Sequence, residues 1–86
     1  MTFVYVIYSE TTDHYYIGLA KDVQIALWQH NARAISATAD GKPWVIKFRL
    51  GFETRPEAQS LEMKLKNKNR QGLEEWLQGQ SERANE

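Results

Sequence analysis

Residues 3–30, FVYVIYSETTDHYYIGLAKDVQIALWQH, contain the strongest signals for the fold. This stretch opens with two runs of β-branched and aromatic residues, 3–8 and 15–19, on either side of the polar segment 9–14. This arrangement predicts a β-hairpin with a polar loop. Because both runs are almost continuously apolar, we expect a sheet that is covered on both faces.

A helix is predicted to follow the hairpin, because Asp22 is a good N-cap residue and apolar residues recur behind it at helical spacing. The residues expected to face the sheet are Val23, Ala26, Leu27, His30 and Ala34. Ile25, Trp28 and Ala32 fall on the other side, where a two-layer domain normally exposes polar groups. Either Trp28 folds over against a loop, or Ile25 and Trp28 form a surface for a protein partner.

The middle of the chain predicts a loop and then a long strand. Residues 36–43 are small and polar and contain Gly41 and Pro43, which is typical of a loop. Along the strand that follows, residues 44–52, side chains should alternate between two faces. One face is expected to carry Trp44, Ile46, Phe48, Leu50 and Phe52, and the other Val45, Lys47 and Arg49. Two cations on one side of a strand either meet solvent or contact a backbone phosphate.

The last third of the chain predicts two helices. Thr54-Arg55-Pro56-Glu57 is a capping box with proline in the first turn, so a helix should begin there and run to about residue 66. Its expected buried stripe consists of Ala58, Leu61 and Leu65. Glu62 lies at the edge of that stripe and is either an ordinary surface residue or a placed ligand. A short helix over residues 72–77 should close the core.

The resulting order, ββαβαα, predicts a small α+β fold in which helices flank a three-stranded antiparallel sheet. Eighty-six residues suffice for one domain with one modest core, expected at residues 1–78, and a polar tail at 79–86. The chain has no cysteine, which excludes disulfides, thiolate metal sites and cysteine nucleophiles. No apolar run approaches the roughly 20 residues of a membrane-spanning helix, so we expect a soluble, cytoplasmic protein without a membrane partner.

Charge is distributed unevenly along a chain whose formal net charge is zero. Residues 42–70 carry a net charge of +5, whereas residues 1–41 carry −2 and residues 71–86 carry −3. Such a basic block is either a solvated face or an attraction for phosphate. The candidate nucleic-acid-binding residues are Lys21, Arg33, Lys47, Arg49, Lys64 and Lys68.

Two tyrosines and a histidine are candidates for chemistry. Tyr5 and Tyr16 would lie on paired strands and His30 on the next helix, so the three could share one surface. Phenols beside an imidazole can act as an acid/base set, because neighbouring groups shift the pKa of each into the working range. Tyrosine is also a good strand residue, so a purely structural role in the core is the alternative.

Taken in order, these motifs resemble the GIY-YIG family, whose small nucleases include the endonuclease part of bacterial nucleotide-excision repair and many homing and restriction enzymes. The matching segments are Phe3-Val4-Tyr5, Tyr16-Ile17-Gly18, Gln29-His30-Asn31, Pro43-Trp44, and residues 52–58 leading to Leu61-Glu62. The resemblance covers residues 3 to about 77 and is closest to the short single-domain bacterial branch. It implies the fold of that family and DNA as the partner.

The resemblance further implies hydrolysis of a DNA phosphodiester by water with the help of one divalent cation, Mg²⁺ or Mn²⁺. It assigns the cation to Glu62, and a carboxylate does suit hard cations. Tyr5 and Tyr16 would position or deprotonate the water, and His30 would support that step. No small-molecule cofactor is expected. The candidates for a late asparagine that family members also use are Asn67 and Asn69.

One position departs from the family pattern. The resemblance places an arginine that stabilises the charged transition state where this chain has Ala26, and the preceding residue, Ile25, is also apolar. Alanine cannot donate to a phosphoryl oxygen, and a donor of this kind is typically worth about 10²- to 10³-fold in rate. The cations that could substitute are Arg33, Lys21, Lys47 and Arg49.

We therefore expect a DNA endonuclease-like domain that is impaired at position 26. The alternative is a catalytically degenerate domain that binds nucleic acid or a protein, supported by Ala26 and by the apolar residues Ile25, Trp28 and Ala32. A third hypothesis is a metal-free structural module in which the tyrosines serve only the core.

Overall fold

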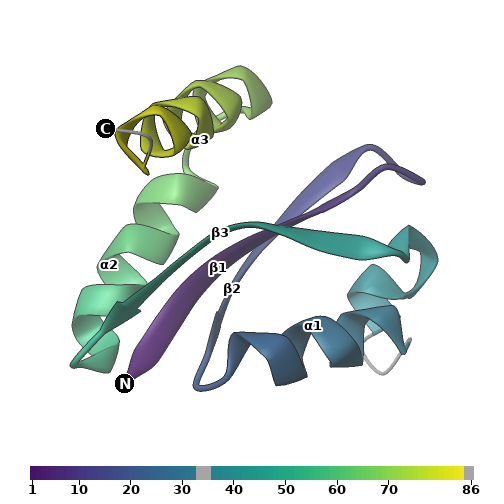
Figure 1. Cartoon of the computed structure of the whole chain (residues 1–86), viewed down its shortest axis with the longest axis horizontal. Coiled ribbons are helices and arrows are strands. Elements are labelled where there is room, and N and C mark those ends of the chain that lie inside the picture. Colours follow the sequence, from purple (N-terminus) through teal and green to yellow (C-terminus); the bar gives the residue numbers. More distant parts are fainter. Residues whose placement is uncertain (33–35, 85–86) are drawn as a thin grey trace.

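The computed structural model describes residues 1–32 and 36–84 and shows an antiparallel sheet between helical layers (Figure 1). Its elements are β1 (Thr2–Ser9), β2 (His14–Ala20), α1 (Val23–Asn31), the 3₁₀ helix η1 (Ser36–Gly41), β3 (Trp44–Phe52), α2 (Arg55–Lys66) and α3 (Arg70–Ala84). Apart from the short η1, this is the order ββαβαα, which confirms the predicted α+β fold.

The sheet has β1 at its centre, in the order β2-β1-β3, and both pairings are antiparallel. Tyr5 of β1 lies opposite Gly18 of β2 and Arg49 of β3. Directly opposed residues point to the same face of a sheet, so these three positions share one face. Helix α1 packs on that face, whereas α2 and α3 pack on the other, as Figure 1 shows.

Each face of the sheet has its own apolar cluster. The buried residues on the α1 side are Tyr5, Ile7, Val23, Ala26 and Trp44. Those on the side of α2 and α3 are Val4, Val6, Ala58, Leu65 and Leu73. Alternate residues of β1 therefore enter opposite clusters, as the two-residue period of a strand requires. Burial of this central strand from both sides explains the continuous apolar run over residues 3–8.

Strand β3 does not alternate as predicted, because its pairing with β1 contains a bulge. Val6 pairs with Phe48 and Ile7 with Ile46, so Lys47 is an extra residue in β3. Ile46 consequently packs in the α1-side cluster, whereas Phe48 packs on the side of α2 and α3. The prediction that alternate residues of this strand share one face throughout was wrong, since an extra residue reverses the facing of every side chain beyond it.

The starts of α1 and α2 follow their sequence signals to different degrees. The Asp22 carboxylate caps α1 by accepting a hydrogen bond from the Ile25 N–H at 3.1 Å. Thr54 precedes α2, but its hydroxyl donates to the Glu57 carboxylate at 2.7 Å and makes no hydrogen bond to the helix backbone. The reciprocal capping box expected here is therefore not formed, although Pro56 does lie in the first turn.

Two segments contain more helix than predicted. The loop expected over residues 36–43 includes η1. The short helix expected over residues 72–77 is part of the longer α3, which begins at Arg70. Asn69 stabilises that start, because its side-chain oxygen accepts a hydrogen bond from the Gly72 N–H at 2.8 Å.

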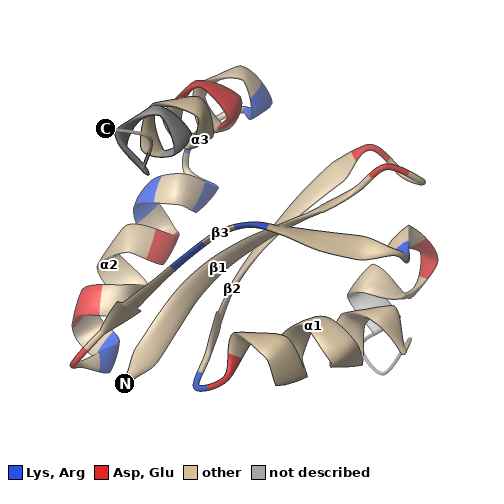
Figure 2. Cartoon of the chain, viewed as in Figure 1, with Lys and Arg blue, Asp and Glu red and all other residues tan. Residues whose placement is uncertain are grey.

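Charged residues are spread unevenly over the helices (Figure 2). Helix α1 carries no Lys, Arg, Asp or Glu between residues 23 and 31, whereas α2 and α3 carry both signs. Within residues 1–32 and 36–84, no helix is both long and apolar enough to cross a membrane. The sheet face that holds Tyr5 is therefore covered by α1, the helix without charged residues.

Candidate active site

A buried chain of hydrogen bonds joins β1, α1 and η1. The Tyr5 phenol oxygen lies 2.9 Å from His30 Nε2, and the Thr38 hydroxyl lies 2.7 Å from His30 Nδ1. All three residues are buried. Because one nitrogen of a neutral imidazole donates while the other accepts, the Tyr5 and Thr38 hydroxyls must take opposite roles toward the ring.

The second tyrosine completes a cluster of rings around His30. The Tyr16 ring centroid lies 4.8 Å from that of His30 and 6.3 Å from that of Tyr5. Gly18 allows this approach, since a Cβ atom at that position would lie 2.7 Å from the Tyr5 phenol oxygen. The structure thus brings together Tyr5, Tyr16 and His30, which the sequence places up to 25 residues apart.

Burial sets the protonation states of the Tyr5–His30 pair. It raises the pKa of Tyr5 to about 12, with smaller contributions from Tyr16 and from the negative charge of Glu62. Burial also lowers the pKa of His30 below its usual range. At neutral pH Tyr5 is therefore a phenol and His30 a neutral imidazole, which is able to accept a proton.

Hydrogen bonds between the end of α1 and the start of β3 hold His30 in place through Asn31 and Trp44. The Asn31 side-chain oxygen accepts a hydrogen bond from the Trp44 N–H at 2.6 Å, and its amide donates to the Trp44 carbonyl at 3.3 Å. The Trp44 indole in turn donates to the Thr38 carbonyl at 2.9 Å. Because Thr38 also contacts the His30 ring, these bonds orient the imidazole from the side opposite Tyr5.

An open cleft of about 470 Å³ lies beside this cluster, between β2 and α1. Its walls include Tyr5 and Tyr16 on the sheet, Ala26 on the helix and Lys21 in the connection between them. Ala26 faces this cleft although the residue is only 7 % exposed. A phosphodiester in the cleft would meet two phenols, while Ala26 would offer it no hydrogen-bond donor.

Glu62, the predicted metal ligand, lies in the other helical layer of the molecule. It lies on α2, and its side chain is 18 % exposed. Its carboxylate lies 3.2 Å from the Lys66 ammonium, one turn along the helix. The negative charge of Glu62 is the smallest of the three causes that raise the pKa of Tyr5, and Glu62 is not among the residues that line the cleft.

The family model for the GIY-YIG catalytic domain matches residues 1–75, which is most of the chain. The chain belongs to the GIY-YIG family. No curated protein and no solved structure matches it at the level required for a relationship. Membership points to nuclease-like function with DNA as substrate, and GIY-YIG nucleases generally depend on a divalent metal.

The residues of this GIY-YIG domain fit a divalent cation held by few protein ligands. Glu62 is a partly exposed carboxylate, the ligand type that Mg²⁺ prefers. Among the described residues, Glu62 included, no three His, Cys, Asp or Glu side chains gather into a ligand set for a metal ion. Mg²⁺ commonly binds through one or two carboxylates and completes its shell with water and substrate oxygens. Lys66 would compete with the cation for Glu62.

The basic residues predicted to bind nucleic acid do not form one surface. Lys21 lines the cleft, and Arg49 lies opposite Tyr5 on the same face of the sheet. The Lys47 ammonium instead lies 5.6 Å from the centroid of the Tyr8 ring, away from the cleft walls. The expectation that Lys47 and Arg49 share a side is therefore wrong, because the bulge separates them.

The remaining candidates lie outside the walls of the cleft or outside the described residues. Lys64 is exposed on α2. Lys68 lines a second groove, between β2 and the start of α3, whose walls also include Tyr16. Arg33, together with the core candidate Ala34, lies outside the residues that the structure describes. Asn67 is the C-cap residue of α2 and uses only its backbone N–H there, whereas the Asn69 side chain caps α3.

The apolar side of α1 is open to solvent. Ile25 is 57 % exposed and Trp28 is 67 % exposed. The alternative in which Trp28 folds over against a loop is therefore wrong, since most of its side chain remains accessible. Ile25 also lines the cleft, so this apolar side borders the candidate site.

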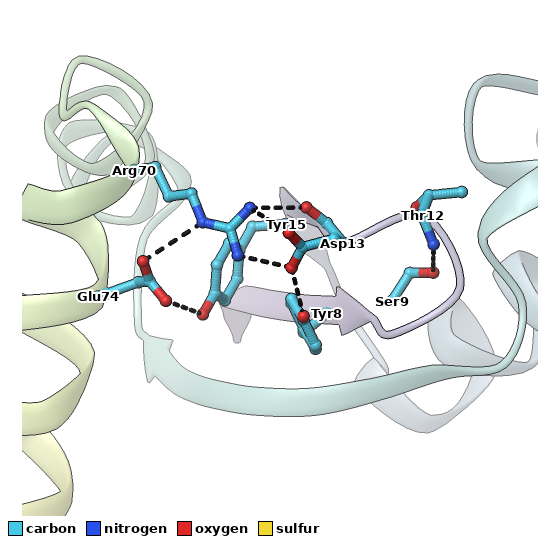
Figure 3. Close-up of polar contacts among 7 residues, drawn as sticks. All are labelled: Tyr8, Ser9, Thr12, Asp13, Tyr15, Arg70 and Glu74. Atoms are coloured by element: carbon cyan, nitrogen blue, oxygen red, sulfur yellow. Dashed lines mark hydrogen bonds and ion pairs between the residues drawn. The ribbon is translucent and has the colours of Figure 1, made fainter.

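A second polar cluster lies at the tip of the hairpin, on the other side of the sheet (Figure 3). Arg70 donates to both Asp13 carboxylate oxygens, at 2.6 and 3.0 Å, and to the Asp13 carbonyl at 2.8 Å. Tyr8 donates to the same carboxylate at 2.5 Å, and Glu74 accepts from Arg70 and Tyr15. We call these five residues the Arg70 cluster; it ties the hairpin to α3.

Sequence reasoning missed Thr38 and the role of Gly18. Thr38 lies in a segment that reads only as a loop, and no local pattern pairs it with His30 eight residues earlier. Gly18 belongs to the second tyrosine motif, but the reason for glycine appears only when Tyr5 is placed opposite it. Alternation along the two paired strands was the signal from which this could have been found.

Proposed function

We propose that this domain binds a DNA phosphodiester in the cleft between β2 and α1 and hydrolyses it slowly, with one divalent cation at Glu62. The observation that carries the proposal is the 2.9 Å contact between Tyr5 and His30 at the wall of a cleft that Tyr16 also lines. This contact places a proton acceptor behind a phenol that faces the substrate.

The protonation states suggest how the residues divide the work. Tyr5 is a phenol at neutral pH, so it can donate a hydrogen bond to His30 and accept one from an attacking water. Neutral His30 can take the proton that Tyr5 passes on as the water attacks. Tyr16 helps to position the water. When bound, a divalent cation neutralises charge on the phosphoryl oxygen and stabilises the leaving group.

Ala26 explains why we expect slow turnover. The methyl group faces the cleft where a cationic donor would stabilise the charge that develops on the phosphoryl oxygens. Loss of one such preorganised donor typically lowers the rate by about 10²- to 10³-fold. An arginine at this position would enter the cleft, since Ala26 forms part of its wall.

The decisive experiment compares the natural protein with Ala26→Arg on duplex and branched DNA, in Mg²⁺ and in Mn²⁺. We expect weak cleavage by the natural protein and faster cleavage by the variant. Glu62→Gln in each background, which keeps the shape but removes the charge, should abolish both activities. If neither protein cuts any substrate in either metal, hydrolysis is not the function.

A second candidate function is binding without catalysis, and Ala26 together with exposed Ile25 and Trp28 favours it. In this case α1 presents an apolar surface to a protein, or the cleft holds DNA without cutting it. DNA binding should weaken steeply with salt, because released counterions drive it. Binding of a protein through Ile25 and Trp28 should persist at high salt and disappear in Trp28→Gln.

A further inference from the structure

We propose that Lys21 and Arg49 form a phosphate-binding corner that contacts the phosphate backbone of the DNA strand bound in the cleft. This inference rests on the proposed function, because it concerns the same bound strand. It goes further, because it identifies the edge of the site over which the bound DNA strand continues beyond Tyr5 and Tyr16. That edge is the end of the cleft near the start of α1 and the middle of β3.

The corner is defined by a cavity that adjoins the cleft. This cavity has a volume of about 340 Å³, and its walls include Lys21, Arg49 and Phe3. Lys21 also lines the cleft that holds Tyr5 and Tyr16, so it belongs to both spaces. Arg49 lies opposite Tyr5 in the β1–β3 pairing and projects from the same face of the sheet. The two cations therefore continue the surface of the candidate active site.

Both cations are available for an anion. Among residues 1–32 and 36–84, neither Lys21 nor Arg49 forms an ion pair, whereas Lys66 is paired with Glu62. Asp22 is the carboxylate in the wall of the cavity, and one of its oxygens accepts the capping hydrogen bond from Ile25. Helix α1 adds no other charge. The corner thus keeps a net positive charge beside a cleft that otherwise lacks cations in its walls.

The chemistry of these side chains fits a phosphate backbone better than bases. A guanidinium presents a planar fork that matches phosphate oxygens, and an ammonium binds phosphate as a point charge. Both residues are exposed, and exposed cations on a strand and a connection contact backbone phosphates without reading sequence. We therefore expect the corner to position the strand and to contribute little sequence preference.

The test measures how DNA affinity depends on salt, in EDTA so that no cleavage occurs. Fluorescence anisotropy with a labelled duplex gives the slope of log affinity against log salt concentration. Lys21→Ala and Arg49→Ala should each reduce the magnitude of this slope by about 1, and the double variant by about 2. Lys47→Ala is the matched control, because it removes the same charge from β3 at the bulge, where the side chain lies over the Tyr8 ring and away from the cleft walls.

The control should keep the natural slope, and thermal melting should show all four variants folded. The inference is overturned if Lys47→Ala lowers the slope as much as the other two, or if Lys21→Ala and Arg49→Ala leave it unchanged. Cleavage by Ala26→Arg is measured separately. Its absence would contradict the proposed hydrolysis, whereas the slopes alone decide the phosphate-binding corner.

Discussion

The Tyr5–His30–Thr38 chain and the Arg70 cluster both join segments that are far apart in the sequence, but they do so in different surroundings. The first is buried under α1 and contains no formal charge at neutral pH. The second lies at the surface and contains Arg70, Asp13 and Glu74. One contact in the first spans 25 residues, and one in the second spans 57.

This difference distinguishes a candidate catalytic site, the Tyr5–His30–Thr38 chain, from a structural contact, the Arg70 cluster. Burial moves the pKa of Tyr5 and His30 in opposite directions and so prepares a phenol and a proton acceptor. In the Arg70 cluster, hydrogen bonds from Arg70 and Tyr8 lower the pKa of Asp13 to about 2, which keeps its carboxylate ionised and paired. Surface ion pairs contribute little to stability, because water and salt screen them. We therefore expect substitutions in the Tyr5–His30–Thr38 chain to lower stability much more than substitutions in the Arg70 cluster.

The largest effect is expected for His30→Ala. The substitution leaves a cavity in the α1-side core and removes the hydrogen-bond partner of the buried Tyr5 phenol. It should lower the free energy of unfolding in urea by about 2–4 kcal/mol. His14→Ala, at the exposed start of β2, is the matched control and should change it by less than about 0.5 kcal/mol. Equal losses in the two variants would contradict the distinction between buried and exposed groups.

Gly18→Ala should come next. Its Cβ atom would lie 2.7 Å from the Tyr5 phenol oxygen and 2.9 Å from the ring carbon that carries it, so Tyr5 must move. Overpacking of this kind costs about 1–3 kcal/mol and should also weaken the bond to His30. Gly79→Ala is the control, because a Cβ there meets no atom within 4 Å. That variant should gain about 1 kcal/mol from helix propensity, and a stabilised Gly18→Ala would show that the tyrosines are not tightly packed.

The two clusters should lose their contributions to stability over different ranges of acidic pH. The lowered pKa of His30 means that its contribution to stability is complete above about pH 6.5 and declines as the pH falls below that value. The pKa of Asp13 is lowered to about 2, so its contribution should be complete above about pH 4 and decline toward pH 2. Melting temperatures of the natural protein, His30→Asn and Asp13→Asn across this range should show two distinct windows. A single shared window would contradict the assignment.

The smallest effect is expected for Arg70→Gln. This change removes the contacts to Asp13 and Glu74, all of them exposed to solvent. The melting temperature should fall slightly at low salt and return to the natural value near 1 M salt, where the screening length is only about 3 Å. The loss caused by His30→Ala should not depend on salt. If Arg70→Gln lowered the melting temperature strongly at every salt concentration, the Arg70 cluster would contribute to stability as a buried interaction does.

Much of the fold follows from local patterns in the sequence. The apolar runs over residues 3–8 and 15–19 identify a hairpin that is covered on both faces. Asp22 and the spacing behind it identify α1 with Val23, Ala26 and His30 facing the sheet. The order of the motifs also indicated the GIY-YIG family and the absence of arginine at position 26. These features depend on the period of a strand or helix, which each segment carries within itself.

Other features depended on how segments meet. The bulge in β3 places Lys47 and Arg49 in different surroundings. No pattern within residues 44–52 predicts this bulge. Local patterns were enough to predict the elements, their order and the residue types available for chemistry. The pairing of His30 with Thr38, the position of Gly18 opposite Tyr5 and the shared cavity of Lys21 and Arg49 arise only when the segments pack together. Register, close approach and burial are properties of two packed segments, so the pattern of either segment alone does not encode them.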